Sequence, residues 1–590
     1  MKLLIKKTIE ATERSILSRR ECLRRLALPG AAMALGPILS ATRVEAQTAA
    51  TSVPRGDDAG SRVYNVRAYG AKGDGVSLDT AALQASIDVC HMEGGGTVFV
   101  PKGTFVIGTV ELKSNVTLHI VASGKLLGSG KGKDYHAAGS IPLKGDSTLN
   151  DGNWALIYAF NAKNITIEGM GTIDGQGAQF VAPGPNQLSP SGLEDDQRPY
   201  HVLFYGCERV LIKDVALING AYHSVRIIHS QLVQIDRVYI HNRVNGNNDG
   251  FHFISCKHVA VSNCTVYALD DACAMFGSCE CFTVNNCFFS TRWSVFRFGG
   301  GVARNIAISN CILKQVYGCP IKFQGNEGAL FEDISFSNLI LDDVTGPIHI
   351  SVGSGEHGKA VNPGLTPELA ESSRKPPAAR RISFSHIHGT VTTSPGRLEG
   401  LPDGGGYREG ERFNCITLNA VGNGTIEDIS FDDVQLTFGG GGTAAMAARR
   451  DLPQVASEYF MLGPMPAYGL YARNARGVTV MNLRLKVDTP DLRPAIVFDH
   501  VEDAALNAIN AQGNVLGESL LRLIDSKQVL ITALRATTEC STCLQIEGVE
   551  SHGIVVDGGD LSRAAEVTSF SNGAMKSSVS LRSATQPGSL

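Results

Sequence analysis

The chain has 590 residues, of which 43% are hydrophobic, and a formal net charge of −4. This length permits several compact domains or one elongated repeat domain, because repeats are not limited by the size of a single core. Removing residues 1–46 leaves 44 basic and 53 acidic residues, a formal charge of −9, which disfavours a nucleic-acid partner. The 65 glycines and the low aromatic content, 7%, favour many short strands over long helices.

The first 46 residues predict an export signal. Ser18–Arg24 reads SRRECLR, which resembles the twin-arginine motif, and an apolar run over 26–41 leads to small residues ending at Ala46. An uncleaved membrane anchor is the alternative, but the run is shorter than the roughly 20 residues that span a bilayer and contains two prolines. We expect a twin-arginine signal peptide at 1–46, a linker at 47–61, and a periplasmic or secreted protein without membrane association after cleavage.

An N-terminal cap is predicted at residues 62–105. Residues 79–88 have a helical pattern behind Asp79, a candidate N-cap, and the run GGGTVFVP at 94–101 predicts a following strand. A helix here would cover the exposed edge of the first coil of a repeat structure.

Short apolar strands then recur at a nearly constant interval. The third residues of six such strands are 23, 26, 23, 24 and 28 residues apart: Ile212, Ile235, Val261, Val284, Ile308 and Phe336. The series continues at Phe384, Phe431 and Val480, at steps near 48 that we interpret as two coils each, and then at Leu506, Ile531 and Val556. A leucine-rich repeat is the alternative, but no leucine consensus or helical stretch occurs within the repeats.

The sequence therefore predicts an all-β fold, a single-stranded right-handed parallel β-helix of about fifteen coils over residues 62–575. The last residues, 576–590, are expected to form a disordered tail. Two stretches rich in glycine, proline and charge, about 353–380 and 395–412, predict long loops that wall a substrate cleft.

The cysteines predict buried thiols. Loss of Cys22 leaves 13, an odd number, and twin-arginine cargo folds in the reducing cytoplasm. Cys264, Cys287 and Cys311 are one coil apart, so they form a file along the stack. Residues in one file lie about 4.8 Å apart without converging, which favours packing over a metal site.

Three aspartates are the candidate catalytic groups. Asp249 precedes the pair Asp270-Asp271 by about one coil, so all three should lie on the same side of neighbouring coils. Glycoside hydrolysis needs a protonated acid and an ionised base, and crowded carboxylates keep one of their number protonated. Turn chemistry and a calcium site are the alternatives, since Asn and Asp are common in turns, as at Asn263, and three carboxylates also suit a hard cation.

These residues resemble glycoside hydrolase family 28, the polygalacturonase and rhamnogalacturonase family of the pectin lyase-like superfamily. Asn247-Asn248-Asp249 and Asp270-Asp271 match its Asn-x-Asp and Asp-Asp motifs. Residues 198–210 resemble a further segment of the family, and 466–471 and 493–498 resemble segments of a bacterial branch of it. The resemblance implies that Asp270 is the general acid, that Asp249 and Asp271 activate water in an inverting displacement, and that no metal or organic cofactor takes part.

The chain departs from the family at two motifs. Arg292-Trp293-Ser294 stands where the family has Gly-His-Gly, and Pro320-Ile321-Lys322 stands where it has Arg-Ile-Lys, so the lysine is kept and the arginine lost. We expect Asn247, Arg292, Trp293, Arg297 and Lys322 to bind substrate, with a surface salt bridge as the alternative for either arginine and a core-covering role as the alternative for Trp293.

The function predicted is thus an exported glycosidase, polygalacturonase-like, which cleaves a polysaccharide or oligosaccharide, most simply a pectic one, and acts as a monomer. A polysaccharide lyase on the same fold is one alternative; it would need a base at C5 of the sugar and usually calcium. A non-catalytic carbohydrate-binding β-helix is the other. His223 and His252 lie near the same coils, and histidines beside strands are more often structural than catalytic, so neither receives a role.

Overall fold

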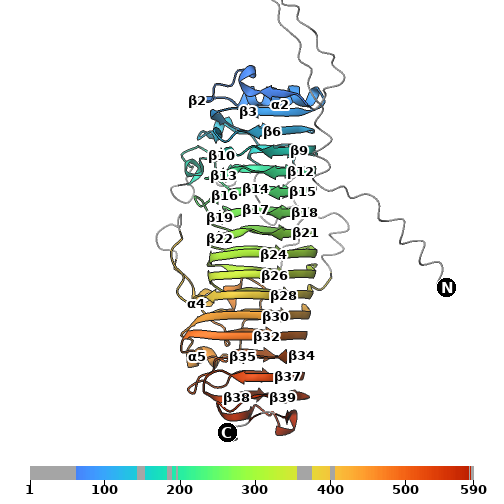
Figure 1. Ribbon diagram of the computed structural model, residues 1–590, viewed down its shortest axis with the longest axis vertical. Helices are drawn as coiled ribbons and strands as arrows, with labels where there is room; N and C mark the ends of the chain where they lie inside the picture. The colour runs from blue at the N-terminus through green and yellow to red at the C-terminus, as the bar shows by residue number, and fades with distance from the viewer. Residues whose placement is uncertain are drawn as a thin grey trace, which may run out of the picture. The chain divides into compact units, whose positions relative to one another are not determined.

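The computed structural model describes residues 61–141, 153–182, 189–194, 197–354, 375–398, 406–583 and 585. The predicted signal peptide and nearly all of the predicted linker lie outside these ranges, as do parts of both predicted loops. The described residues from 61 onward form a stack of parallel coils with one long axis, in which chain order follows position along the stack (Figure 1). No helix among them is both long enough and apolar enough to cross a membrane.

Each coil contributes strands to three faces. The first face contains β1 (Val63–Asn65), β3 (Gly96–Val100), β6 (Val116–Ile120), β9 (Lys163–Glu168), β12 (Glu208–Lys213), β15 (Gln231–Asp236), β18 (Lys257–Ser262), β21 (Cys279–Asn285), β24 (Val302–Val316), β26 (Leu330–Val344), β28 (Ala378–Val391), β30 (Thr425–Gly440), β32 (Ala475–Thr489), β34 (Glu502–Asn507), β37 (Lys527–Ala536), β39 (Ile554–Asp560) and β41 (Val579–Arg582). The second face contains β2 (Asp74–Leu78), β4 (Gly103–Ile107), β7 (Gly124–Gly128), β10 (Thr172–Asp174), β13 (Ala216–Ile218), β16 (Tyr239–Asn242), β19 (Thr265–Ala268), β22 (Phe288–Thr291) and β35 (Asn510–Ala511), and the long strands β24 to β32 continue into it.

The third face is a separate 15-stranded parallel sheet, and it carries the site. Its strands are β5 (Val110–Glu111), β8 (Ala155–Phe160), β11 (Tyr200–Tyr205), β14 (Val225–Ile228), β17 (Phe251–Ile254), β20 (Cys273–Phe276), β23 (Ser294–Gly299), β25 (Cys319–Gly325), β27 (Ile348–Gly353), β29 (Ile416–Val421), β31 (Leu470–Arg473), β33 (Ile496–Asp499), β36 (Leu521–Ile524), β38 (Cys540–Glu547) and β40 (Ala564–Ser571). A right-handed parallel β-helix was predicted, and the parallel pairing of successive coils confirms the class.

The register of the first face agrees with the predicted repeat. Ile212 pairs with Ile235, and each later member of the series pairs with the next, as far as Val556. These side chains point into the core, because alternate residues of a strand face the interior. Phe336, Phe384 and Phe431 stack there with ring centroids 5.1 Å apart.

One detail of the repeat was predicted wrongly. Phe336 pairs directly with Phe384, and Phe384 with Phe431, so each step near 48 is one coil and not two. The additional residues leave the stack between strands, and among those described they include α4 (Glu409–Arg412), α5 (Ala444–Ala447) and η5 (Tyr459–Leu462). Sequence spacing alone does not distinguish two coils from one coil with an insertion.

The predicted cap helix is α2 (Thr80–Met92), which lies at the N-terminal end of the stack beside β3 (Figure 1). Asp79 stands at its N-cap position, but its carboxylate accepts hydrogen bonds from the backbone N–H groups of Lys72 and Gly73 and none from the helix. It therefore secures the preceding loop. The remaining helical turns are η1 (Val66–Tyr69), η2 (Gly132–Asp134), η3 (Gly177–Phe180) and η6 (Lys576–Ser578).

The C-terminal boundary also needs correction. Residues 576–583, predicted to be disordered, contain η6 and β41, and β41 pairs with β39 from Ile554↔Val579 to Asp557↔Arg582. The stack thus gains one further strand at the edge of the first face.

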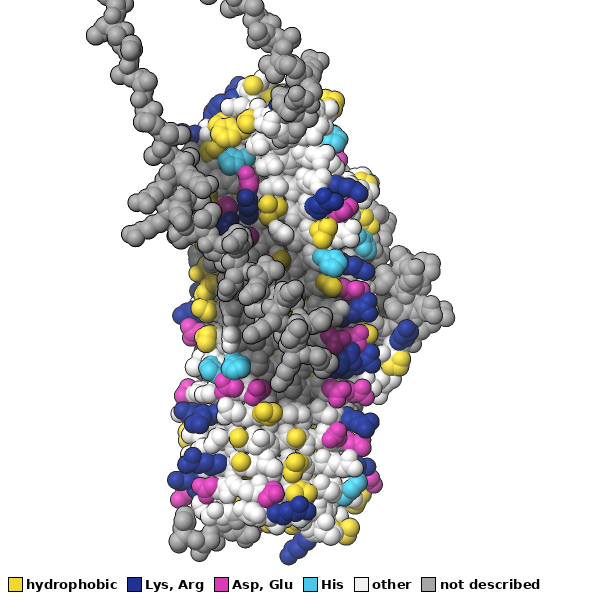
Figure 2. Space-filling model, turned by 45° about the vertical axis from the view of Figure 1, so that its right-hand side comes forward, with side chains coloured by type: hydrophobic (Ala, Val, Ile, Leu, Met, Phe, Trp, Pro, Cys, Tyr) yellow, Lys and Arg dark blue, Asp and Glu magenta, His cyan; other side chains and the backbone are white. Residues whose placement is uncertain are grey.

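Outward positions repeat from coil to coil as well. Asn263, Asn286 and Asn310 all adopt left-handed backbone conformations, just after β18, just after β21 and within the long strand β24, and asparagine is well tolerated there. Charged side chains form columns along the stack (Figure 2). Glu280, for example, lies between Lys257 and Arg304 of the two adjacent coils.

The 13 cysteines of the described residues are all free, and all but Cys281 are buried. Cys264, Cys287 and Cys311 belong to the core, where the Cys264 N–H lies 3.4 Å from the Cys287 Sγ. The prediction of buried thiols in a file is confirmed.

Candidate active site

The candidate site lies at the turn that leads into the third face, on the coils that contain β17, β20, β23 and β25. Phe251 of β17 pairs with Cys273 of β20, so Asp249 and Asp271, each two residues earlier, occupy equivalent positions on adjacent coils. The Gly250 N–H donates to the Asp271 carbonyl at 3.0 Å, which continues the ladder to the site. The predicted placement of these aspartates on one side of neighbouring coils is confirmed.

Asp270 is half-buried and is held by a neighbour from the previous coil. The Asn247 side-chain amide donates to Asp270 Oδ2 at 3.4 Å, and Arg198 in turn donates to Asn247 Oδ1 at 3.3 Å. Asn247 has a left-handed backbone conformation, with φ of 55°, which turns its side chain toward Asp270. The structure thus brings Asn247, a predicted substrate-binding residue, into contact with the predicted acid.

The surroundings raise the pKa of Asp270 to about 7. Loss of water contact is the main cause, and the negative charges of Asp271 and Glu458 add to it, whereas the ammonium of Lys322 acts in the opposite direction. A carboxyl group with this pKa carries a proton through the mildly acidic range. Asp270 can therefore donate a proton where an ordinary aspartate cannot.

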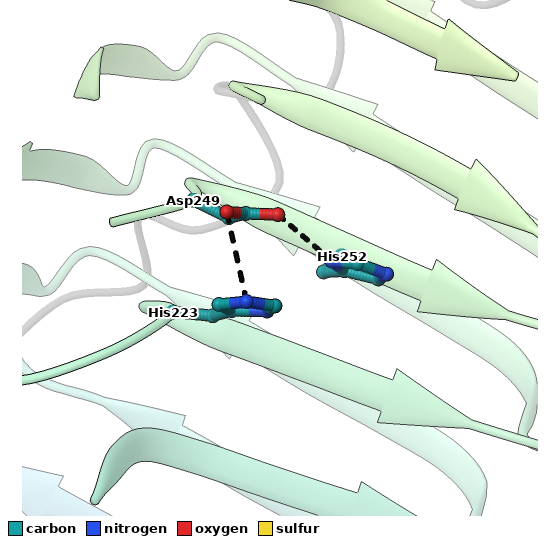
Figure 3. A group of neighbouring side chains, drawn as sticks. All are labelled: His223, Asp249 and His252. Carbon is teal, nitrogen blue, oxygen red and sulfur yellow. Dashed lines mark hydrogen bonds and ion pairs between the residues drawn. The ribbon is translucent and has the colours of Figure 1, made fainter. Parts of the chain in front are cut away.

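Asp249 is 4% exposed and contacts two buried histidines (Figure 3). His252 Nδ1 lies 2.8 Å from Asp249 Oδ2, and His223 Nε2 lies 3.6 Å from Oδ1. The two imidazoles stack on each other with centroids 4.7 Å apart. Burial holds the pKa of both histidines well below the usual value, so both rings are neutral near neutral pH. In the tautomer that carries its proton on Nδ1, a neutral His252 donates to Asp249 Oδ2 and orients that carboxyl group.

Asp271 is held from the following coil. The Ser294 N–H donates to Asp271 Oδ1 at 3.1 Å, and Arg297 Nε lies 4.0 Å from Oδ2. A backbone amide and a guanidinium therefore support this carboxylate.

Lys322 and Arg297 are adjacent, since β23 and β25 pair them directly. Lys322 Nζ donates to Glu458 Oε2 at 2.8 Å, and Arg297 Nη2 lies 3.9 Å from Glu458 Oε1. Burial by itself would raise the pKa of Glu458, but the two cations outweigh it and hold that pKa at about 2. Glu458 is thus an anion at mildly acidic and at neutral pH.

Arg292 points to a different partner. Its guanidinium donates to Glu411 Oε1 at 2.7 Å and to the Tyr317 carbonyl at 2.9 Å, and Glu411 is fully buried. The predicted alternative of a surface salt bridge does not describe this contact, because the Glu411 side chain, in α4, is buried. Its role in substrate binding stays a prediction.

Trp293 lies between the two groups of charges. The Arg292 guanidinium is 4.8 Å from its ring centroid, Lys322 Nζ is 5.6 Å from it, and the ring of Phe460 is 6.1 Å away. Trp293 is partly exposed, so both a sugar contact and a covering role remain compatible with its position.

One group of three potential metal ligands occurs among the described residues: His223, Asp249 and His252, with ligand atoms within 4.8 Å of one another. Asp270 and Asp271 do not belong to it, so the three aspartates do not form the calcium cluster considered above. The positive charges of Arg226 and Arg297 act on His252, which opposes a bound cation there.

Sequence reasoning missed two acidic residues and the role of the histidines. Glu458, next to η5, is 136 residues from Lys322, and Glu411, in α4, is 119 residues from Arg292. No periodic signal places either one, because both lie in insertions outside the repeat. His252 had a local signal, since it is the third residue after Asp249.

Comparison with known proteins identifies relatives of this part of the chain. The model of the family Glycosyl hydrolases family 28 matches residues 90–365, which include all eight predicted site residues. Exo-poly-alpha-D-galacturonosidase of Dickeya chrysanthemi is 29% identical over 353 residues, 50% of this chain and 57% of its own length. Exopolygalacturonase of Platanus acerifolia is 23% identical over 57% of this chain and 85% of its own length.

Among solved structures, the family 28 exopolygalacturonase of Yersinia enterocolitica is similar, with a TM-score of 0.51 and 19% identity over 75% of this chain and 78% of its own. This similarity supports the fold. The family model matches residues 90–365, so the similarity to glycosyl hydrolases family 28 lies in the part of the chain that contains the site.

Proposed function

We propose that the chain is a glycosidase that hydrolyses glycosidic bonds of a pectic polysaccharide. The observation that carries this proposal is Asp270, a half-buried carboxyl group whose pKa is raised to about 7, beside Asp271 and one coil from Asp249. The names of the family relatives, which include an exo-poly-alpha-D-galacturonosidase, support a pectic substrate. The alignment spans just over half of that relative, so the activity is proposed here from the site.

The proposed reaction is a single inverting displacement. Asp270 gives its proton to the leaving glycosidic oxygen while water attacks the anomeric carbon from the opposite side, and Asp249 and Asp271 take a proton from that water. The C–O bond to the leaving group breaks as the C–O bond to water forms. One water is consumed. The water proton ends on Asp249 or Asp271, and the Asp270 proton ends on the hydroxyl of the leaving group.

The positions of the neighbouring groups suit these roles. His252 and Ser294 donate to Asp249 and Asp271, which fixes the orientation of both carboxyl groups as acceptors of a water proton. Asn247 donates to Asp270 and so orients the acid without neutralising it. His252 lies on the same coil as Asp249, whereas Asn247 and Ser294 reach Asp270 and Asp271 from the adjacent coils.

The proposal extends to location and assembly. The twin-arginine pattern at Ser18–Arg24 supports export to the periplasm or the medium, where polysaccharides are found. A stack whose first coil is covered by α2 has no open edge at that end, which supports a monomer.

Hydrolysis is tested by incubating the purified full chain with polygalacturonan, rhamnogalacturonan and neutral glycans. Reducing ends and ultraviolet absorbance are followed together, and the anomer of the first product is read by NMR. Reducing ends without absorbance, with inverted configuration and loss in Asp270→Asn, are expected. Absorbing unsaturated products would indicate a lyase, and release of no product from any substrate would indicate a binding protein.

A further inference from the structure

Two cations that were predicted to bind substrate, Lys322 and Arg297, already hold a carboxylate of the protein. Glu458 contacts Lys322 Nζ at 2.8 Å and Arg297 Nη2 at 3.9 Å. Resting on the proposed hydrolase function, we propose that the sugar bound at this subsite is uncharged, and that Glu458 is the residue that determines this specificity.

Exposure of the three side chains supports the assignment. The Lys322 side chain is 3% exposed and that of Arg297 is 10% exposed, whereas that of Glu458 is 31% exposed. A sugar that arrives at the site therefore meets the Glu458 carboxylate before either cation. A uronate would bring a second negative charge to the same place, and like charges at this range repel.

The remaining charges of the site do not compensate for this. Asp249, Asp270 and Asp271 are acidic. The two cations over the Trp293 ring each have a protein anion beside them, since Arg292 contacts Glu411 and Lys322 contacts Glu458.

The segment around Glu458 is anchored, so the carboxylate is a fixed part of the site. Asn419 donates to the Val455 carbonyl at 2.9 Å, His349 Nε2 lies 3.3 Å from the Ser457 carbonyl, and the buried Tyr459 donates to the Tyr317 carbonyl at 3.3 Å. These contacts lie on both sides of Glu458. They hold its backbone against the strands that carry Lys322.

A fixed carboxylate suits a sugar that offers hydroxyl groups. Hydroxyls donate to an ionised carboxylate in short, strong hydrogen bonds, and two neighbouring hydroxyls can bind its two oxygens. The chemical class expected is a neutral hexose, a 6-deoxyhexose or a uronate whose acid is esterified. All three classes present hydroxyls without a negative charge.

The test compares two substrates that differ only in the methyl esters of their acid groups, and therefore in charge: fully methyl-esterified and de-esterified homogalacturonan oligosaccharides. It adds neutral galactan oligosaccharides and rhamnogalacturonan oligosaccharides. The full chain is expected to have a kcat/KM at least about tenfold higher for the esterified partner. Glu458→Gln, which keeps the shape and removes the charge, should raise kcat/KM for the de-esterified partner about tenfold through a lower KM. The matched control is Glu566→Gln, at an exposed position on β40.

Preference of the wild-type chain for the de-esterified partner, or a loss of its hydrolysis in folded Glu458→Gln, would overturn the inference. Failure to hydrolyse any substrate would overturn the proposed function instead. In that case calorimetric binding of the same oligosaccharide pair decides the inference: tighter binding of the esterified partner supports it. Equal or weaker binding of that partner, or no binding of either, overturns it.

Discussion

The His252 imidazole and the Asp249 carboxylate lie 2.8 Å apart, Nδ1 to Oδ2, in a pair that is almost completely buried. This contact orients one of the proposed water-activating groups.

The first prediction concerns the contact between His252 and Asp249. His252→Ala should lower kcat by roughly 10- to 100-fold with KM changed little, because a carboxylate misplaced by about 1 Å can cost roughly 100-fold in rate. His252→Asn, whose amide can replace Nδ1, should recover part of the loss.

Steady-state kinetics on folded protein measure this split between kcat and KM. A purely structural role would lower the melting temperature of His252→Ala and leave kcat per folded molecule unchanged, and that result would remove the positioning role.

The second prediction concerns the acid. Asp270→Asn should lower kcat by roughly 10²- to 10⁴-fold, the usual contribution of general acid catalysis, because an amide cannot protonate the leaving oxygen. Asp432→Asn, at an exposed position on β30, is the matched control and should retain full activity. Activity of Asp270→Asn near the wild-type level would show that the acid lies elsewhere.

The third prediction is the pH dependence. Asp270 must be protonated to act, and its pKa is raised to about 7. Above about pH 7, kcat/KM should therefore fall tenfold for each pH unit, and this fall is the alkaline limb of the profile. Lys322 lowers this pKa, so Lys322→Gln should move the limb to higher pH. The profile is recorded in both proteins with one neutral substrate. A limb that stays in place or moves downward would contradict the assignment to Asp270.

The fourth prediction concerns the core. Phe384 stacks between Phe336 and Phe431 and is fully buried. Phe384→Ala should cost about 3–5 kcal/mol, and the melting temperature should fall by several degrees. Ser383→Ala, on the opposite side of the same strand, is the control. Equal melting temperatures for both variants would indicate that the aromatic stack adds no stability.

The fifth prediction concerns the thiols. Cys281 is the one exposed cysteine of the 13 in the described residues, and no disulfide forms among them. A thiol reagent should therefore modify about one group in native Cys22→Ser protein and 13 after unfolding, and Cys281→Ser should remove the native reaction. Fewer than 13 thiols in the unfolded, unreduced protein would reveal a disulfide.

Much of the fold followed from the sequence because a β-helix repeats one requirement in every coil. The position of Ile212 must be apolar in each rung, and the series that begins there pairs in register as far as Val556. The same regularity placed Asp249 beside Asp271, since their separation is close to one coil. Periodicity thus determined the class of fold, the core and the neighbourhood of the aspartates.

The tertiary structure decided what the period does not encode. Spacing did not show that the steps between Phe336, Phe384 and Phe431 are single coils with insertions, because an insertion of one coil's length has the same spacing as a coil. Spacing also did not predict the contact between Glu458 and Lys322. Glu458 lies in an irregular segment outside the repeat, and the tertiary contacts of that segment determine its position. The sequence by itself determined the scaffold and its carboxylates, whereas only the folded insertions decided which anions lie beside Lys322 and Arg292.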